Sequence, residues 1–356
     1  MALLLAGTSS TAWGRPRLLN CTSNCMRFEG PTCAGPRPVH DRRNVSSWWK
    51  FNPRAAAAAS HRIAVAGEVV ALYSPNMNIN HAFHEDLWSV LSYMRHSAHR
   101  SSATVVSWVA TAWLSDLLHA AAELYGWRLL TPSSRSSWVC AEGAQARLLL
   151  NGRDSRLGFD RHLLPEIKEE LRRHVLRGEP APLLSGSGGG GGGPQKQKER
   201  VVIYSRLDDS STRQLHGAEP VAALFDAARF DVSVAASIPE GFAAQARFFG
   251  SVSLLVAPNG GWAPNVLWLP RHACLVEVHM YRTSSWIKMF GLAETFLTDR
   301  FLLVTGDYHN LSAPRMPQNP KRIGGDDAIQ GSRLKADLRA ALARSAHCRR
   351  FLRRTA

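Results

Sequence analysis

The sequence predicts an α/β protein built from two similar halves, and three observations support this. Short apolar runs bounded by glycine or proline alternate with segments of helical periodicity along most of the chain. The stretch GSGGGGGGPQKQKE, residues 186–199, cannot pack into a core and separates the halves. The 356 residues, 45% of them hydrophobic, can bury one large or two medium cores. We therefore expect two globular domains.

The first half alternates strand and helix in a βαβ-like manner. The expected strands are Ala64–Tyr73, Thr104–Val109 and Trp127–Leu130. Before the last of these, Ala112–Tyr125 has the pattern of an amphipathic helix, which Gly126 closes.

The second half predicts a Rossmann-like sheet with four strands and three intervening helices. The strands are Val201–Ser205, Val232–Ala235, Ser253–Val256 and Leu275–Val278. The helices are Ala218–Ala228, Gly241–Phe249 and Asn265–Leu269. Two such halves would face each other across a cleft.

The tail, Ser332–Arg354, has apolar residues at steps of four and a basic opposite face. This pattern is typical of a closing helix packed across a domain, with a membrane-surface helix as the alternative. The expected organisation has five parts: an unassigned N-terminal extension (1–60), a first Rossmann-like domain (61–180), a glycine-rich linker or insertion (181–199), a second Rossmann-like domain (200–325) and a basic C-terminal helix (326–356).

The charge balance favours an anionic partner, because 43 Lys and Arg against 28 Asp and Glu give a net charge of +15. Eight of the 43 basic residues lie in the tail, Arg333–Arg354, and the others are spread along the chain. Neither a zinc-finger spacing nor a basic block interleaved with aromatic residues accompanies them. We therefore expect an anionic small molecule and no nucleic acid.

The cysteines and glycosylation sequons are informative about the cellular compartment of the protein. The six cysteines lack the paired CxxC spacing of a zinc site, so disulfides and buried free thiols both stay open. Three N-x-S/T sequons, at Asn20, Asn44 and Asn310, favour a secretory lumen. The opening MALLLAG is too short for a signal peptide and lacks its basic region. Either the start is truncated or the protein is soluble where it is made, and membrane association would require a missing N-terminal anchor.

Residues 254–279, LLVAPNGGWAPNVLWLPRHACLVEVH, read as strand, glycine turn, helix and strand, with Pro264 in the first helical turn. In that geometry unpaired backbone N–H groups and the helix dipole would attract an anion, most often a phosphate. Gly260 and Gly261 would let such a ligand approach the backbone closely. The alternative is a tight turn that needs positive φ.

Residues 76–96, NMNINHAFHEDLWSVLSYMRH, predict a helix that begins near His81, with Asn78 or Asn80 as its cap. An apolar stripe would face a core, and an ionisable face would lie beside it. The stripe is Phe83, Leu87, Val90 and Met94; the adjacent face carries His81, His84, Glu85 and Trp88, while Asp86 points away from both.

Three interpretations of this ionisable face stay open. His81 and Glu85 would ligate a metal, although no HExxH motif or third ligand supports this. Glu85 would instead be a general base, oriented by His81, which deprotonates an acceptor hydroxyl. The third interpretation is a solvated helix face with a capping role.

These stretches together resemble glycosyltransferase family 61, which includes protein O-linked-mannose and EGF-domain O-linked N-acetylglucosaminyltransferases and plant xylan glycosyltransferases. The family's N-x-x-H-x-F-x-D/E segment is matched by Asn78, His81, Phe83 and Glu85. Its Ser-Arg strand end with a second arginine is matched by Arg206 and Arg213 in VVIYSRLDDSSTRQLHGAEPVAALF. Its H-G-A-G-L-T-N loop, LP turn and strand with glutamate match APNGGWAPNVLWLPRHACLVEV, with Gly260, Asn265, Pro270 and Glu277 in register.

The resemblance implies a GT-B fold with two Rossmann-like domains, the donor bound mainly by the second and the acceptor mainly by the first. It implies an inverting hexosyl- or pentosyltransferase that moves a sugar from a nucleotide-sugar, expected to be a UDP-sugar, to a hydroxyl of a glycoprotein or polysaccharide. A Golgi or endoplasmic reticulum lumen follows from it. No metal cofactor is required, because arginines and backbone amides can replace a cation, although a divalent cation would be compatible.

The resemblance also assigns site residues. The catalytic set is Glu85 as base and His81 as its partner, with His84 and Asp86 as further candidates; the donor set is Arg206, Arg213, Asn259, Gly260, Gly261, Asn265 and Glu277. Asn259 stands where the family has histidine and cannot carry a positive charge. The alternative is therefore a catalytically degenerate nucleotide- or glycan-binding protein of the same fold.

Overall fold

The computed structural model describes residues 18–20, 25–28, 49–50, 56, 58–72, 88–96, 103–107, 111–132, 137–142, 146–149, 164–177, 198–208, 214–216, 218–258, 260–279, 299–304 and 329–353. Contacts group the chain into two compact units, Met1–His174 and Val175–Ala356. Within the described residues, no helix has both the length and the apolar character needed to cross a membrane. The domain boundaries expected from the sequence stay a prediction.

The first unit contains two sheets. Its strands are β1 (Leu18–Asn20), β2 (Cys25–Phe28), β3 (Trp49–Lys50), β4 (Arg62–Ala66), β5 (Val69–Leu72), β6 (Thr104–Val106), β7 (Arg128–Leu130), β8 (Trp138–Glu142) and β9 (Ala146–Leu149). One sheet has the order β1-β9-β5-β6-β7, and only β1 is antiparallel to its neighbour. The other sheet, β3-β2-β8-β4, has mixed direction.

The expected single strand Ala64–Tyr73 is wrong, because the chain there forms two strands that belong to different sheets. Gly67 lies between them with φ of 85°, a conformation that interrupts an extended strand. The N–H of Gly67 donates to the carbonyl of Glu142 at 3.3 Å, while the carbonyl of Glu68 accepts from Thr104 at 2.8 Å. The glycine therefore switches the chain from one sheet to the next.

The described residues of the first unit include helices α3 (Trp88–His96) and α4 (Ala112–Tyr125) and nearly all of α5 (Leu164–Val175). The bounds of α4 are those predicted. Thr111 Oγ1 accepts from the N–H of Leu114 at the helix start, and Gly126 closes the helix with φ of 70°. The helix contacts α3 and the edge strand β7.

Helix α5, which sequence analysis missed, is fastened to α3 and α4 by one ionic network. Arg95 Nη2 contacts Glu166 at 2.6 Å and Glu170 at 2.9 Å. Tyr125 donates its hydroxyl to Glu170 at 2.8 Å. Partial burial alone would lower the pKa of Arg95, but the hydrogen bonds and charges of the two carboxylates outweigh it and raise that pKa.

The second unit is built on one fully parallel sheet with the order β12-β10-β13-β14-β15. The strands are β10 (Arg200–Tyr204), β12 (Asp231–Ala235), β13 (Val252–Pro258), β14 (Cys274–His279) and β15 (Asp299–Val304). The four predicted strands are confirmed, and β15 was missed. A pair of short strands, β11 (Leu215–His216) and β16 (Ile329–Gln330), lies outside this sheet.

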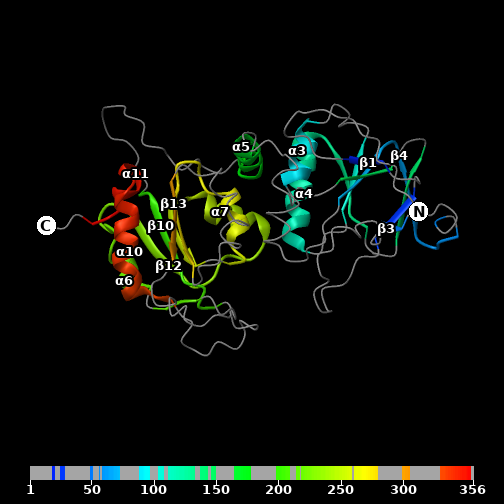
Figure 1. Ribbon diagram of the computed structural model, residues 1–356. Helices are drawn as coiled ribbons and strands as arrows, with labels where there is room; N and C mark the ends of the chain where they lie inside the picture. Colours follow the sequence, from blue (N-terminus) through cyan, green and yellow to red (C-terminus); the bar gives the residue numbers. More distant parts are fainter. Residues whose placement is uncertain are drawn as a thin grey trace, which may run out of the picture. The chain divides into compact units, whose positions relative to one another are not determined.

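Helices cover both faces of this sheet (Figure 1). The α10 face carries α6 (Glu219–Ala222), α10 (Gly331–Ala343) and α11 (Ala346–Arg349). The α7 face carries α7 (Phe242–Gly250) and the 3₁₀ helix η4 (Ala263–Leu267). On the α10 face one apolar cluster joins alternate strand residues to the tail: Val201, Ile203, Leu254, Val256, Val276, Val278, Leu334, Leu338 and Leu342. The tail is therefore a closing helix, as expected.

Two helical predictions need correction. The segment Ala218–Ala228 is helical only over Glu219–Ala222, because beyond it the backbone bonds to the C-terminal segment instead. The N–H of Asp226 donates to the carbonyl of Phe351 at 3.2 Å, and that of Arg353 to the carbonyl of Leu224 at 2.8 Å. The tail is two helices, since Ser345 has extended backbone and its Oγ caps α11.

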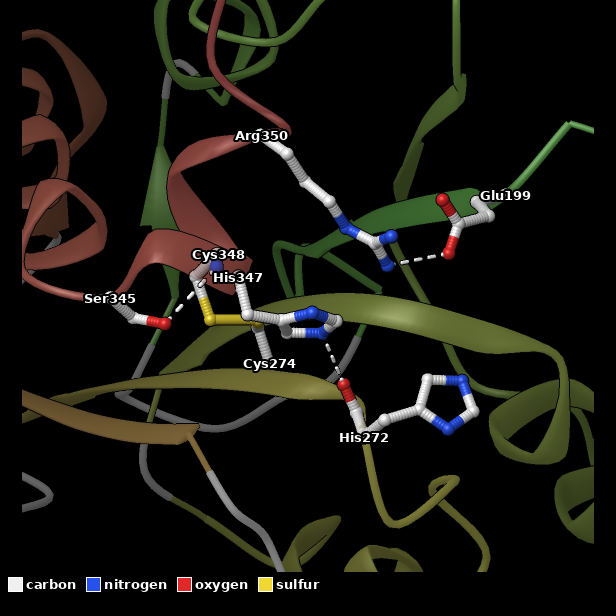
Figure 2. The surroundings of a disulfide bond; sticks show 7 residues. All are labelled: Glu199, His272, Cys274, Ser345, His347, Cys348 and Arg350. Atoms are coloured by element: carbon white, nitrogen blue, oxygen red, sulfur yellow. Dashed lines mark hydrogen bonds and ion pairs between the residues drawn. A yellow bond between two sulfur atoms is a disulfide. The ribbon is translucent and has the colours of Figure 1, made fainter. Parts of the chain in front are cut away.

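A disulfide joins the tail to the sheet (Figure 2). Cys274, the first residue of β14, is bonded to Cys348 of α11, which lies 74 residues later, and both are fully buried. Beside it His347 Nε2 lies 2.7 Å from the carbonyl oxygen of His272, and Arg350 pairs with Glu199 at 2.6 Å. Cys140 is also disulfide-bonded, so the choice left open by the sequence is settled for these three cysteines.

Candidate active site

The strand order of the second unit marks one place where a ligand would bind. From β10 the chain continues to β12 on one side, whereas β13, β14 and β15 follow on the other side. Neighbouring β10 and β13 therefore form the switch point of the sheet. In open parallel sheets the loops at the carboxyl ends of these two strands separate and leave a crevice for ligands.

Arg206 lies just after the carboxyl end of β10, beside this switch point, and its backbone is held in an unusual conformation. Its φ is 59°, in the left-handed region that costs a residue with a Cβ about 1–2 kcal/mol. Backbone hydrogen bonds on both sides fix it: before it, Ser205 N–H donates to Ala235 O and Leu215 N–H to Ser205 O, both at 2.8 Å, and after it Asp208 N–H donates to Ala236 O at 3.3 Å. The side chain thus leaves the strand end in one defined direction.

The structure brings Arg206 and Gly260 into direct contact. A Cβ on Gly260 would overlap Nη1 of Arg206 and lie 2.8 Å from its Cζ, and the Arg206 side chain is 6% exposed. Among the described glycines, φ is positive at Gly67, Gly126 and Gly241 but not at Gly260 or Gly261. The glycine at 260 therefore makes room for a guanidinium, and the positive-φ interpretation is wrong.

The rest of the loop also differs from the prediction. The expected two-turn helix is a 3₁₀ helix of five residues. Two of its backbone donors are already paired, Ala263 N–H with Gly260 O at 3.1 Å and Asn265 N–H with Trp262 O at 2.8 Å. These two N–H groups are therefore already used within the loop, while the anion site itself stays a prediction. Gly261 is exposed, and a Cβ there would meet no atom within 4 Å.

Asn265 and Glu277 lie on the α7 face, both 2% exposed. Asn265 Nδ2 donates to Gln245 Oε1 at 3.0 Å, while its Oδ1 is buried and has no hydrogen-bond partner in the part of the chain that the structure describes. Glu277 lies opposite Ala257 in the register of β13 and β14. Because Val276 and Val278 belong to the α10-face cluster, the intervening Glu277 points to the other face.

Sequence reasoning missed three residues that shape this edge. Ser205 Oγ donates to Ala235 O at 3.2 Å, and Trp262 Nε1 donates to the carbonyl of Pro258. Gln245 holds Asn265 as described above. The spacing of Phe242, Gln245 and Phe249 on one helix face was the available signal for Gln245.

Several predicted residues lie outside the described part of the chain. They are Asn78, His81, His84, Glu85, Asp86, Arg213, Asn259, Asn44 and Asn310. In the sequence, the predicted catalytic segment comes between Leu72, the last residue of β5, and Trp88, the first described residue of α3. In the predicted apolar stripe, the burial of Val90 and Met94 is confirmed. Asn20 belongs to the edge strand β1.

A family model described as Glycosyltransferase 61 matches residues 80–276, which is more than half of the chain and includes both Arg206 and Gly260. The chain belongs to glycosyltransferase family 61. This family 61 protein is therefore a glycosyltransferase, an enzyme class that takes a nucleotide-sugar donor and a glycan acceptor. No curated protein matches the chain significantly. The α/β class with parallel sheets is confirmed, while the GT-B arrangement of two domains stays a prediction.

Proposed function

We propose that this family 61 glycosyltransferase transfers a sugar from a UDP-sugar to a hydroxyl of a glycoprotein or polysaccharide with inversion at the anomeric carbon. The observation that carries the proposal is the contact of Arg206 with Gly260 at the switch point of the parallel sheet. A buried guanidinium at the carboxyl end of a parallel strand is chemically suited to bind a phosphate.

The diphosphate is the leaving group, so its charge grows in the transition state. A guanidinium binds phosphate oxygens with two parallel hydrogen bonds, and a site with little water strengthens them. Arg206 is nearly buried and its backbone is fixed, which limits the reorganisation needed when that charge develops. Arg213 would assist Arg206 in this proposal; it lies two residues before Leu215 in the sequence, and the N–H of Leu215 donates to the carbonyl of Ser205. No metal ion is required in this proposal.

The nucleoside end of the donor would contact the α7 face. Glu277, near the carboxyl end of β14, accepts hydrogen bonds from ribose hydroxyls in this proposal, as acidic residues at the ends of Rossmann strands often do. Asn259 and Asn265 supply neutral amide contacts to phosphate or sugar oxygens.

The acceptor is activated from the first unit. Glu85, oriented by His81, takes the proton from the acceptor hydroxyl, whose oxygen attacks the anomeric carbon opposite the leaving group. One carbon–oxygen bond to the acceptor forms while the bond to the diphosphate breaks, and the electron pair leaves with the nucleotide diphosphate. His84 and Asp86 flank this pair in sequence.

We place the enzyme in the lumen of the Golgi or endoplasmic reticulum. The disulfide between Cys274 and Cys348 and the disulfide-bonded state of Cys140 support this, because such bonds persist in oxidising compartments. Three sequons point the same way.

The test is a thermal-shift and calorimetric screen of the full chain against UDP, GDP and a panel of UDP-sugars, with and without manganese. We expect UDP and one UDP-sugar to bind without manganese. Binding of GDP alone, or a strict need for manganese, contradicts the donor proposal. Binding without transfer to any acceptor would favour the degenerate binder.

Turnover of Glu85→Gln tests the base. Without its carboxylate the enzyme should lose about two to four orders of magnitude in kcat, while UDP binding stays near wild type. Undiminished turnover excludes Glu85 as the base.

A further inference from the structure

We propose that Gln245 is a positioning residue of the donor site. Its hydrogen bond to Asn265 fixes the position of Asn265 along helix α7. The loop from Gly260 to Leu269 is thereby held in one alignment with that helix. The proposal rests on the donor-binding function proposed for that loop, and neither the family match nor the sequence motifs assign Gln245 any role.

Helix α7 and the η4 loop meet in three successive pairs. The helix contributes Phe242, Gln245 and Phe249, whose spacing puts them on one face. The loop contributes their partners in reverse order, so that the two segments run antiparallel. The two aromatic pairs are Phe242 with Trp268, whose ring centroids are 5.1 Å apart, and Phe249 with Trp262, whose centroids are 6.4 Å apart. Between them, Asn265 Nδ2 donates to Gln245 Oε1 at 3.0 Å.

The middle pair is polar, although it lies between two aromatic pairs. Asn265 is 2% exposed, and its Oδ1 has no partner within the described residues. Leaving a buried acceptor unpaired costs about 1–3 kcal/mol, whereas two apolar side chains of the same shape would avoid that loss. Stability alone therefore does not account for the amide pair. Ring contacts such as the edge-to-face pair Phe242–Trp268 and the stacked pair Phe249–Trp262 tolerate sliding along the helix. An amide hydrogen bond allows one alignment, so the Gln245–Asn265 pair specifies the register.

Backbone hydrogen bonds connect Asn265 to Gly260, which contacts Arg206. Asn265 N–H donates to the carbonyl of Trp262 at 2.8 Å, and Ala263 N–H donates to the carbonyl of Gly260 at 3.1 Å. Gly260 in turn lies against the guanidinium of Arg206. A shift of Asn265 along α7 therefore moves the backbone that Arg206 packs against, which should weaken donor binding more than it slows the chemical step.

Two substitutions of Gln245 separate this role from simple packing. Gln245→Met keeps the length of the side chain but removes the oxygen that Asn265 needs. Gln245→Glu keeps an acceptor oxygen, and a carboxylate is well tolerated in the first turn of a helix. Gln245→Ser, which is polar but too short to reach Asn265, replaces the methionine variant should that variant misfold.

The experiment compares the full-length wild type with these variants by hydrogen exchange over residues 260–269 and by calorimetry with UDP. We expect Gln245→Met to exchange faster in this peptide and to bind UDP about tenfold more weakly, while Gln245→Glu stays within about threefold of wild type for both. Unchanged exchange in Gln245→Met, or equal weakening by Met and Glu, overturns the proposal. Failure of the wild type to bind UDP overturns the donor proposal instead, and the exchange comparison then still decides whether Gln245 holds the loop.

Discussion

The two faces of the parallel sheet in the second unit are covered by different kinds of contact. On the α10 face an apolar cluster fills the space between strands and tail, and a disulfide fastens the tail to β14. On the α7 face the loop from Gly260 to Leu269 is held by aromatic pairs with one amide pair between them. The predicted donor residues Asn265 and Glu277 lie on this second face. One face thus stabilises the sheet, while the other carries the residues that we propose bind the donor.

This difference predicts that the two faces respond separately to substitution. Changes on the α10 face should lower the free energy of unfolding and leave donor affinity alone. Changes at the loop should weaken donor binding and leave unfolding nearly unaltered. The following predictions test that separation, from the largest expected effect to the smallest.

The double substitution Cys274→Ala/Cys348→Ala should lower the free energy of unfolding most. The bond closes a loop of 74 residues, for which the chain-entropy estimate is about 4 kcal/mol. Denaturant unfolding under non-reducing conditions measures the loss. UDP affinity of the folded variant should equal that of wild type. A folded variant that binds UDP tenfold more weakly would show that the α10 face shapes the donor site.

Arg206→Ala should weaken UDP binding about 10- to 100-fold, because a hydrogen bond to a charged group contributes about 1.5–3 kcal/mol. The UDP affinity of Arg206→Lys should lie between those of wild type and Arg206→Ala, since lysine keeps the charge but not the planar pair of donors. Calorimetry measures both, and thermal midpoints should stay within a few degrees of wild type. Wild-type UDP affinity in Arg206→Ala would show that Arg206 does not bind the donor.

Arg350→Ala is the matched arginine change on the α10 face and should have the smallest effect. It removes the ion pair with Glu199, whose side chain is 33% exposed, and partly exposed pairs contribute about 0–1 kcal/mol. We expect a small decrease in the thermal midpoint and unaltered UDP binding. A loss of UDP affinity comparable to that of Arg206→Ala would mean that arginine substitution acts through overall charge.

Much of the second unit's sheet could be predicted from the sequence, because buried parallel strands are short continuous apolar runs, and the four predicted strands follow from such runs. In the first unit, helix α4 with its glycine cap follows from an equally local pattern. Strand β15 was missed because DRFLLV begins with two charged residues and follows no clear turn signal. The break at Gly67 was missed because periodicity does not reveal which glycine has positive φ.

The candidate site could be predicted only in part. Arg206 and Gly260 were each expected at the donor, but their contact depends on β10 and β13 being neighbours, which no local spacing encodes. The role of Gly260 was therefore assigned to ligand access, whereas in the structure its missing Cβ accommodates an arginine of the same chain. Gln245 was missed because a single polar residue on an amphipathic helix ordinarily faces solvent.

The most direct test of the central claim, that Arg206 and the Gly260 loop form one phosphate site, is a double-mutant cycle of UDP binding. Wild type, Arg206→Ala, Gly260→Ala and the double variant are measured by calorimetry under identical conditions. We expect Gly260→Ala to weaken UDP binding about tenfold in the wild type, because its Cβ displaces the guanidinium, and to have no further effect once Arg206 is alanine. Additive losses, or full UDP affinity in Gly260→Ala, would contradict the claim.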